Sequence, residues 1–282
     1  MAELVPPPVH RHPRWAAGVR AAGRLALVAG LLAGPSGATA EPVAVRLTEG
    51  VSRGFLVLRD AGGVVIARGE SVQKPIGGGQ VWSRLFLDFR DGTRFDERLV
   101  FSQRRVFRLE RYHLVQRGPS LPAAEITFDR ATGRYRARTQ DKPGAEAKQA
   151  SGTLEIPADL SNGLTVTLLR NLPAGAGATV HLVAFTPEPR VVRMVLTPEG
   201  EDRVRVSGGP AMVAHRYLVT FELGVVAGAV AALTGKTPPP LHYWIVAGEV
   251  PAFARFQGPM SVDGPVWRLD QAPLEWPGAP RR

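Results

Sequence analysis

The sequence predicts a mainly β protein, built as a curved antiparallel sheet (an open or half barrel) with one or two short helices packed on its concave side. Apolar and polar residues alternate over much of 54–118, which is the period of a strand with one buried face. Short polar turns separate the alternating runs, as in an antiparallel meander. The 282 residues are 44% apolar and include no cysteine, so an apolar core without disulfides must stabilise the fold.

The clearest strand of the first half is predicted at 81–89, where Leu85, Leu87 and Phe89 share one face. Asp91-Gly92 follows as a hairpin turn, because glycine accepts the positive φ that such turns require. The other turns predicted in this half are 60–63, 77–79 and 132–133, the last between strands at 125–129 and 134–138.

The middle of the chain is predicted to contain a polar, mobile loop near 140–152. Asp159 after it is a candidate N-cap for a short helix near 160–171. Leucines spaced by four residues give this helix one apolar face: Leu160, Leu164, Leu168 and Leu172.

The last third again alternates and predicts strands, with a turn at 198–201. Its most apolar segment, 217–235, fits either a membrane span or a strand to Leu223 followed by a small helix at 225–233. Glu222 favours the second interpretation, because a charged carboxylate near a bilayer centre is costly. The strands predicted here are 179–185, 191–196, 203–206, 241–247, 252–257 and 266–269.

Residues 1–40 have the pattern of a secretory signal peptide. Four arginines precede the apolar run 25–33, which is too short to span a bilayer, and Ala38-Thr39-Ala40 is a typical cleavage site. We therefore expect an exported protein, periplasmic or extracellular, in which residues 41–282 form a single mainly β domain. No transmembrane span is expected after removal of the leader.

The chain is basic, with a formal charge of +10, and residues 41–282 keep 31 basic against 24 acidic side chains. Such a balance indicates anionic partners. For an exported protein we expect an anionic envelope surface rather than nucleic acid. The arginine-rich stretch 84–117 is the candidate contact face, and its simplest interpretation is a solvated face of the sheet.

The sequence contains none of the common catalytic or phosphate-binding motifs, so it predicts no catalytic residue, no cofactor and no metal site. The histidines after residue 40 lack metal-ligand spacing and are predicted to be structural: His113, His181, His215 and His242. A serine, a histidine and an acid could still meet in space, which leaves a secreted hydrolase as an alternative.

Four turn and strand segments are distinctive: Phe101-Ser102-Gln103, 112–120, 235–239 and 264–268. Together they resemble a family of secreted bacterial proteins of unknown function. The sequence is also distantly similar to open β-barrels of the lipoprotein-localisation-factor type, in which a curved sheet wraps short helices around an apolar cavity. The resemblance implies a fold only, and it assigns no functional residue.

These observations predict a secreted or periplasmic binding or carrier protein for an apolar or lipid-like small molecule. The alternatives are a non-enzymatic structural or interaction protein of the cell envelope and the hydrolase. Glu222 is a candidate polar anchor, because desolvation on an apolar strand would raise its pKa. The candidate ligand-lining residues are Leu85, Leu87, Phe89, Val219, Phe221 and Trp244.

Overall fold

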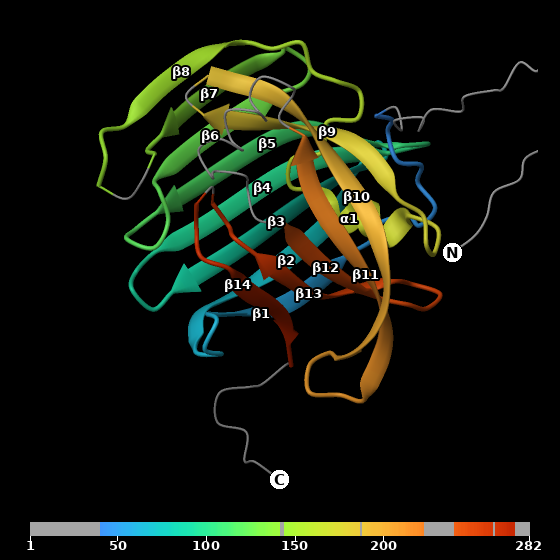
Figure 1. The fold of residues 1–282 in the computed structure, drawn as a ribbon. Coiled ribbons are helices and arrows are strands. Elements are labelled where there is room, and N and C mark those ends of the chain that lie inside the picture. The colour runs from blue at the N-terminus through green and yellow to red at the C-terminus, as the bar shows by residue number, and fades with distance from the viewer. Residues whose placement is uncertain (1–39, 142–143, 187, 223–239, 262, 274–282) are drawn as a thin grey trace, which may run out of the picture. The chain divides into compact units, whose positions relative to one another are not determined.

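The computed structural model describes residues 40–141, 144–186, 188–222, 240–261 and 263–273. They form one antiparallel sheet of 14 strands and one helix, so the predicted fold class is confirmed (Figure 1). The strands are β1 (Ser52–Arg59), β2 (Val65–Gly77), β3 (Gln80–Phe89), β4 (Arg94–Gln103), β5 (Phe107–Arg117), β6 (Ala124–Asp129), β7 (Arg134–Thr139), β8 (Lys148–Thr153), β9 (Ala178–Thr186), β10 (Glu188–Arg205), β11 (Ala211–Glu222), β12 (Leu241–Val246), β13 (Ala252–Gly258) and β14 (Trp267–Ala272).

The sheet consists of two meanders joined at β1 and β14. Its order is β8-β7-β6-β5-β4-β3-β2-β1-β14-β13-β12-β11-β10-β9, so β8 and β9 are its two edges and the sheet is not closed. Glycine forms several of the short turns between chain neighbours: Gly77, Gly78 and Gly79 all have positive φ and connect β2 to β3. The turns predicted at 60–63, 91–92 and 132–133 are confirmed.

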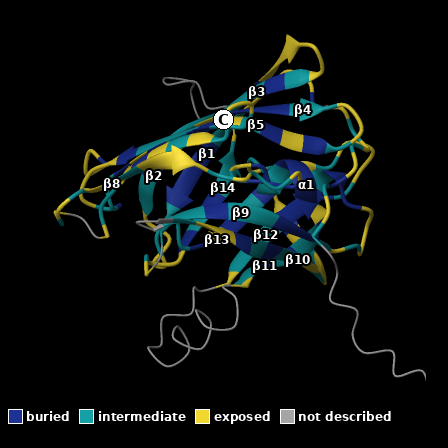
Figure 2. Ribbon diagram, turned by 90° about the horizontal axis from the view of Figure 1, so that it is seen from above, coloured by how far each residue is buried: buried dark blue, intermediate teal, exposed yellow. Residues whose placement is uncertain are grey.

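The sheet bends around α1 (Thr165–Asn171). The largest core cluster joins inward side chains of β3–β7, α1 and β9–β12, which places the helix against both halves of the sheet. Seen from above, α1 lies between β4–β5 on one side and β9–β12 on the other (Figure 2). The four predicted leucines are buried in this cluster, between 1% and 9% exposed.

The helix starts later than predicted, and the predicted N-cap is wrong. Leu164 occupies the N-cap position, and no side chain caps the helix. Gly163 has φ +72°, a left-handed conformation that ends one turn and prevents a continuous helix from residue 160. Asp159 is instead paired with the ring of His181.

Two further predictions need correction. Residues 198–201 do not form a turn: they lie within the 18-residue strand β10, where a β-bulge between Pro198 and Gly200 absorbs the irregular residues. Residues 148–153 are not loop but edge strand β8, whose backbone pairs with β7 although its side chains are polar. The second predicted helix, 225–233, lies outside the described residues.

Candidate functional site

The inner face of β3, β4 and β5 carries one carboxylate, Glu97, in an otherwise apolar row. Cross-strand pairing aligns Glu97 with Leu85 on β3 and with Leu114 on β5. The rows on either side are filled by buried side chains, including Leu87 and Leu99. Leu85, Glu97 and Leu114 themselves are only partly buried. The alternation that built the strand has therefore placed an acid on the face that carries the core.

Glu97 is held by a single described hydrogen bond. The hydroxyl of Tyr112 donates to Glu97 Oε1 at 2.7 Å, and Oε2 has no hydrogen bond within the described part of the chain. A β-carbon added at Gly163 would lie 3.2 Å from Oε2, so the loop before α1 passes close to the carboxylate. Burial raises the pKa of Glu97, and the Tyr112 hydrogen bond offsets this only in part.

A second tyrosine, Tyr243 on β12, completes the polar part of this region. Burial raises its pKa, the charge of Glu97 raises it further, and a hydrogen bond with Thr165 of α1 acts in the opposite direction. Burial and the charge of Glu97 also raise the pKa of Tyr112 well above its ordinary value. Both phenols therefore stay protonated at neutral pH and serve as neutral hydrogen-bonding groups.

The apolar surroundings of Glu97 lie where the core divides. One core cluster surrounds α1, and another contains Phe89 and Trp267. Three residues pack against both clusters, and each is only partly buried: Leu114, Leu241 and Tyr243. Protein atoms surround Glu97 and Tyr243 densely, yet each keeps some solvent-accessible surface.

We call this set the inner patch: Leu85, Glu97, Leu114, Phe221, Leu241 and Tyr243. It combines apolar and aromatic side chains with a few polar groups, which is the composition of small-molecule sites in proteins. The sequence analysis did not select Glu97. The available signal was its position between Phe95 and Leu99, which share a face with it on one strand.

The predicted lining residues divide between the two faces of the sheet. Leu85 and Phe221 are partly buried members of the inner patch. Leu87, Phe89 and Val219 point to the same inner side but are at most 5% exposed within the core. They are core residues of the inner side and have almost no surface that a ligand could contact.

Trp244 and Glu222 lie away from the inner patch. Trp244 belongs to a separate cluster on the outer face with Ala214, Val246 and Ala254, and its indole N–H donates to Asp202 at 2.7 Å. Glu222 is 51% exposed and forms an ion pair with Arg193 at 2.9 Å. Neighbouring strand residues face opposite sides, so Tyr243 and Phe221 occupy the inner face in place of these two.

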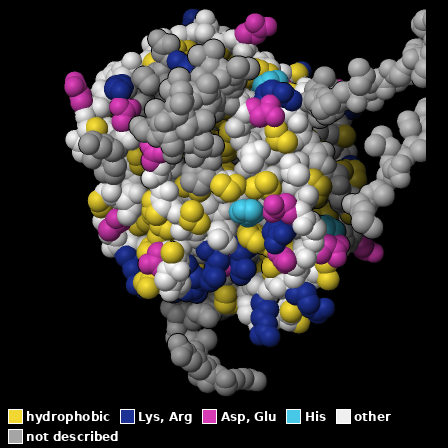
Figure 3. Space-filling view, in the orientation of Figure 1, with side chains coloured by type: hydrophobic (Ala, Val, Ile, Leu, Met, Phe, Trp, Pro, Cys, Tyr) yellow, Lys and Arg dark blue, Asp and Glu magenta, His cyan; other side chains and the backbone are white. Residues whose placement is uncertain are grey.

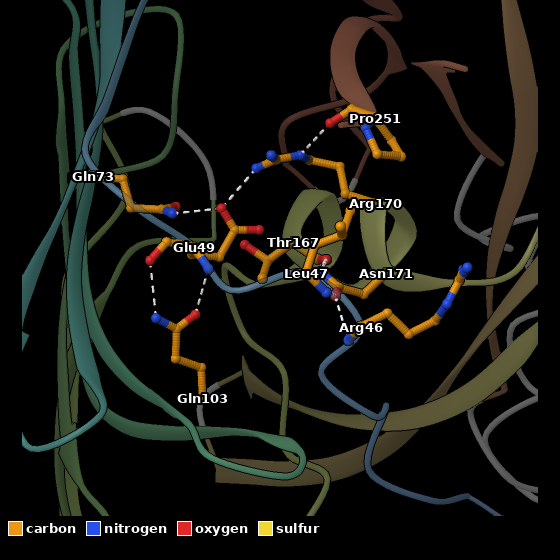
Figure 4. A network of polar contacts seen from close by, with 9 residues as sticks. All are labelled: Arg46, Leu47, Glu49, Gln73, Gln103, Thr167, Arg170, Asn171 and Pro251. Carbon is orange, nitrogen blue, oxygen red and sulfur yellow. Dashed lines mark hydrogen bonds and ion pairs between the residues drawn. The ribbon is translucent and has the colours of Figure 1, made fainter. Parts of the chain in front are cut away.

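A polar network at Glu49 joins the N-terminal segment to the sheet and helix (Figure 4). Glu49 is 3% exposed, and its Oε2 accepts hydrogen bonds from Arg170 at 2.8 Å and Gln73 at 2.7 Å. Gln103 bonds both the backbone N–H and the carbonyl of Glu49. Asn171 accepts the backbone N–H groups of residues 46 and 47, which fixes this segment on α1.

An aspartate–histidine pair lies where β9 meets the loop before α1. Both carboxylate oxygens of Asp159 lie 2.9 Å from His181 Nδ1. The hydroxyl of the nearby Ser161 donates to the backbone oxygen of His181 at 2.8 Å, not to its ring. The three residues therefore do not form a serine–histidine relay, which would need the hydroxyl on the imidazole. They tie the loop to the free side of β9.

The outer face mixes charges, as the space-filling view also shows on one side of the molecule (Figure 3). Asp96 neutralises two arginines that lie directly opposite each other, Arg84 at 2.8 Å and Arg98 at 2.6 Å. Within the described residues there is no cluster of three metal-ligating side chains. In the same residues, no helix is long and apolar enough to cross a membrane.

Comparisons with protein-family models, with curated proteins and with solved structures find no match for this chain.

Proposed function

We propose that the protein is an exported carrier or binding protein for an apolar, lipid-like molecule, which it holds at the inner patch. The observation that carries the proposal is the partial exposure of apolar side chains on the face that should be fully buried. Leu85, Leu114 and Leu241 pack against core clusters whose buried members are at most 9% exposed, yet each of the three keeps some solvent-accessible surface. Export rests on the leader-like pattern of residues 1–40.

The test compares ligand binding by two variants of the same strand. Leu114→Phe enlarges a side chain of the inner patch, whereas Val115→Phe makes the same addition on the opposite face. We expect purified protein to carry a co-extracted apolar molecule in native mass spectrometry and to bind a hydrophobic fluorescent dye. Leu114→Phe should weaken dye binding at least fivefold, and Val115→Phe should leave it within twofold.

Leu85→Phe repeats the measurement from β3 if Leu114→Phe does not fold. Circular dichroism and thermal unfolding establish that each variant is folded. An empty protein that binds no dye, or equal loss in the inner and outer variants, would overturn the carrier proposal.

A second candidate function is attachment to an anionic envelope surface, and the outer face of β7 favours it. Arg134, Arg136 and Arg138 alternate along this strand, and all three are exposed. Unlike Arg84 and Arg98, they have no ion pair within the described residues. Their cross-strand neighbours on β8 are neutral: Gln149, Ser151 and Thr153. On β6, Arg138 lies opposite Glu125, which forms its ion pair with Arg117.

Flotation with vesicles tests this attachment. We expect the wild-type protein to bind vesicles with a high content of anionic lipid at low salt and to dissociate from them at 0.5 M salt. It should not bind zwitterionic vesicles. Replacing the three β7 arginines by serine should reduce binding at least fivefold. A matched triple variant at the paired arginines 53, 94 and 117 removes the same charge, and equal loss in both would reject β7 as the contact face.

A further inference from the structure

We propose that the inner patch selects an apolar molecule whose head group is a hydrogen-bond donor, with a primary amine as the preferred head and a carboxylate or phosphate excluded. This inference rests on the proposed carrier function and adds the chemical class of the ligand. Three features of the inner patch support it: the charges that face Glu97, the hydrogen bonds that Glu97 already makes, and the apolar side chains around it.

The inner patch contains no basic side chain among its six residues. Among the described residues, the inward positions of β3, β4, β5, β11 and β12 hold no lysine or arginine. Arg170, on α1, is already bonded to Glu49 and to the carbonyl of Pro251. The titratable groups that interact with Glu97 are the neutral phenols of Tyr112 and Tyr243. The charge of the exposed Arg46 acts on Tyr217 of β11, and no basic side chain of the described residues acts on Glu97. Within that part of the chain, an anionic head group would therefore face a carboxylate without a cation to offset it.

The Glu97 carboxylate can accept a further hydrogen bond from a ligand. Its Oε1 already accepts the Tyr112 hydroxyl, while Oε2 has no described partner. A carboxylate oxygen in poorly solvated surroundings accepts a hydrogen bond strongly, and an ammonium donor adds a charge interaction. The matching head group is therefore a donor, and a cationic donor also compensates for the desolvation that burial imposes on Glu97.

Apolar side chains surround Glu97. Leu85 and Leu114 flank Glu97 directly in the register, and Leu241 packs against both core clusters. These side chains cannot hydrate an ion, so a small hydrophilic amine would lose its water without compensation. An alkyl or other apolar body gains free energy by covering them, at about 25 cal/mol per Å² of buried apolar surface.

The experiment uses three ligands with one chain length: dodecylamine, dodecanol and dodecanoate, each below its critical micelle concentration, in dye displacement at pH 7.5. We expect dodecylamine to bind at least tenfold more tightly than dodecanoate, with dodecanol between them. The protein has a formal charge of +10, so nonspecific attraction favours dodecanoate. A preference for the amine must therefore arise locally.

Glu97→Gln keeps the size and the acceptor oxygen but removes the charge. It should lower dodecylamine affinity to that of dodecanol and leave dodecanol binding within threefold. Glu125→Gln removes a 51% exposed acid on the outer face and should change none of the three affinities. In the wild-type protein, dodecylamine affinity should also fall as Glu97 becomes protonated toward pH 4, whereas dodecanol affinity should not.

The outcomes separate the two proposals. Equal binding of the three ligands, tightest binding of dodecanoate, or an amine preference that survives Glu97→Gln would overturn the head-group inference while leaving the carrier function intact. Absence of binding by all three ligands and by the dye would overturn the carrier function itself. If Glu97→Gln fails to fold, the pH dependence of amine against alcohol binding decides the question alone.

Discussion

Two inward acids of this protein have opposite surroundings. Glu49, where the N-terminal segment meets α1, is almost fully buried and is bonded by the side chains of Arg170, Gln73 and Gln103. Glu97, on β4, is partly exposed, accepts one hydrogen bond from a phenol, and has no ion pair within the described residues. The same residue type thus joins segments at one place and keeps an unused oxygen at the other.

Glu49 is therefore an acid that stabilises the fold, whereas Glu97 is an acid that is available to a ligand. The bonds around Glu49 connect it to residues 24, 54 and 121 positions away in the sequence, Gln73, Gln103 and Arg170. Its Oε1 is buried without a hydrogen bond to any described residue, so even this well-connected carboxylate depends on the ion pair with Arg170. At Glu97, by contrast, the fold gains little from the charge. We therefore expect opposite responses when each acid loses its charge or its partner.

The largest effect should follow the removal of the Arg170 guanidinium. Arg170→Met leaves Glu49 as a buried charge without its cation, and we expect a loss of about 3–5 kcal/mol in the free energy of unfolding. Denaturant unfolding at pH 7 measures it. The control is Arg53→Met, which breaks an outer-face ion pair with Glu70 whose arginine is 60% exposed. It should cost less than about 1 kcal/mol, and equal losses would show that Glu49 is not a structural acid of the kind described.

A smaller effect at the same end of the molecule should follow Asn171→Ala. Asn171 is 1% exposed, and its side-chain oxygen accepts two backbone N–H groups at 2.9 and 2.7 Å. The loss of the acceptor for these two part-buried N–H groups should cost about 1–3 kcal/mol in the free energy of unfolding. Hydrogen exchange should show that the amides of residues 46 and 47 lose protection before those of β3 and β4. Uniform loss of protection would mean that this segment does not open separately.

The fold was predictable because its main signal is local. Alternation and glycine turns are properties of a few adjacent residues, and they located the turns between β1 and β2, β2 and β3, β3 and β4, and β6 and β7. The predictions failed where long-range pairing overrides local preference. Polar residues 148–153 become a strand because the β7 edge supplies backbone partners. The irregular residues near Pro198 become a bulge because β11 pairs with β10 both before and after them.

The candidate site was less predictable, for a related reason. Leu85 and Phe221 could be assigned to a buried face from their own strands. The alternation with Phe95 and Leu99 gives the face of Glu97 from its own strand, but its place between Leu85 and Leu114 required the register of β3–β5. The importance of Tyr243 required the curvature that brings β12 near α1. Trp244 was predicted to line the site, but it lies one residue from the inward Tyr243 and therefore on the outer face.

The smallest effect, and one of opposite sign, should follow Glu97→Gln. Because burial raises the pKa of Glu97 in the folded protein, the folded state binds more protons than the unfolded state between the ordinary glutamate pKa and the raised one. The contribution of Glu97 is therefore most favourable below the unfolded pKa and is lost as pH rises through the folded pKa. At pH 8 the variant should be more stable than the wild type by about 1 kcal/mol, or ~2–4 °C in Tm.

Below pH 4 the side chain of residue 97 is uncharged in the wild type as well as in the variant. The difference in stability between the two proteins should therefore vanish. Thermal unfolding of the pair from pH 4 to 8 measures this difference and cancels every other titration that the two proteins share. Glu49→Gln in the same series should be destabilising at pH 8, because it removes the charge that Arg170 requires. If Glu97→Gln were also destabilising at pH 8, its carboxylate would be stabilising the fold as Glu49 does, and it would no longer be free to receive a ligand.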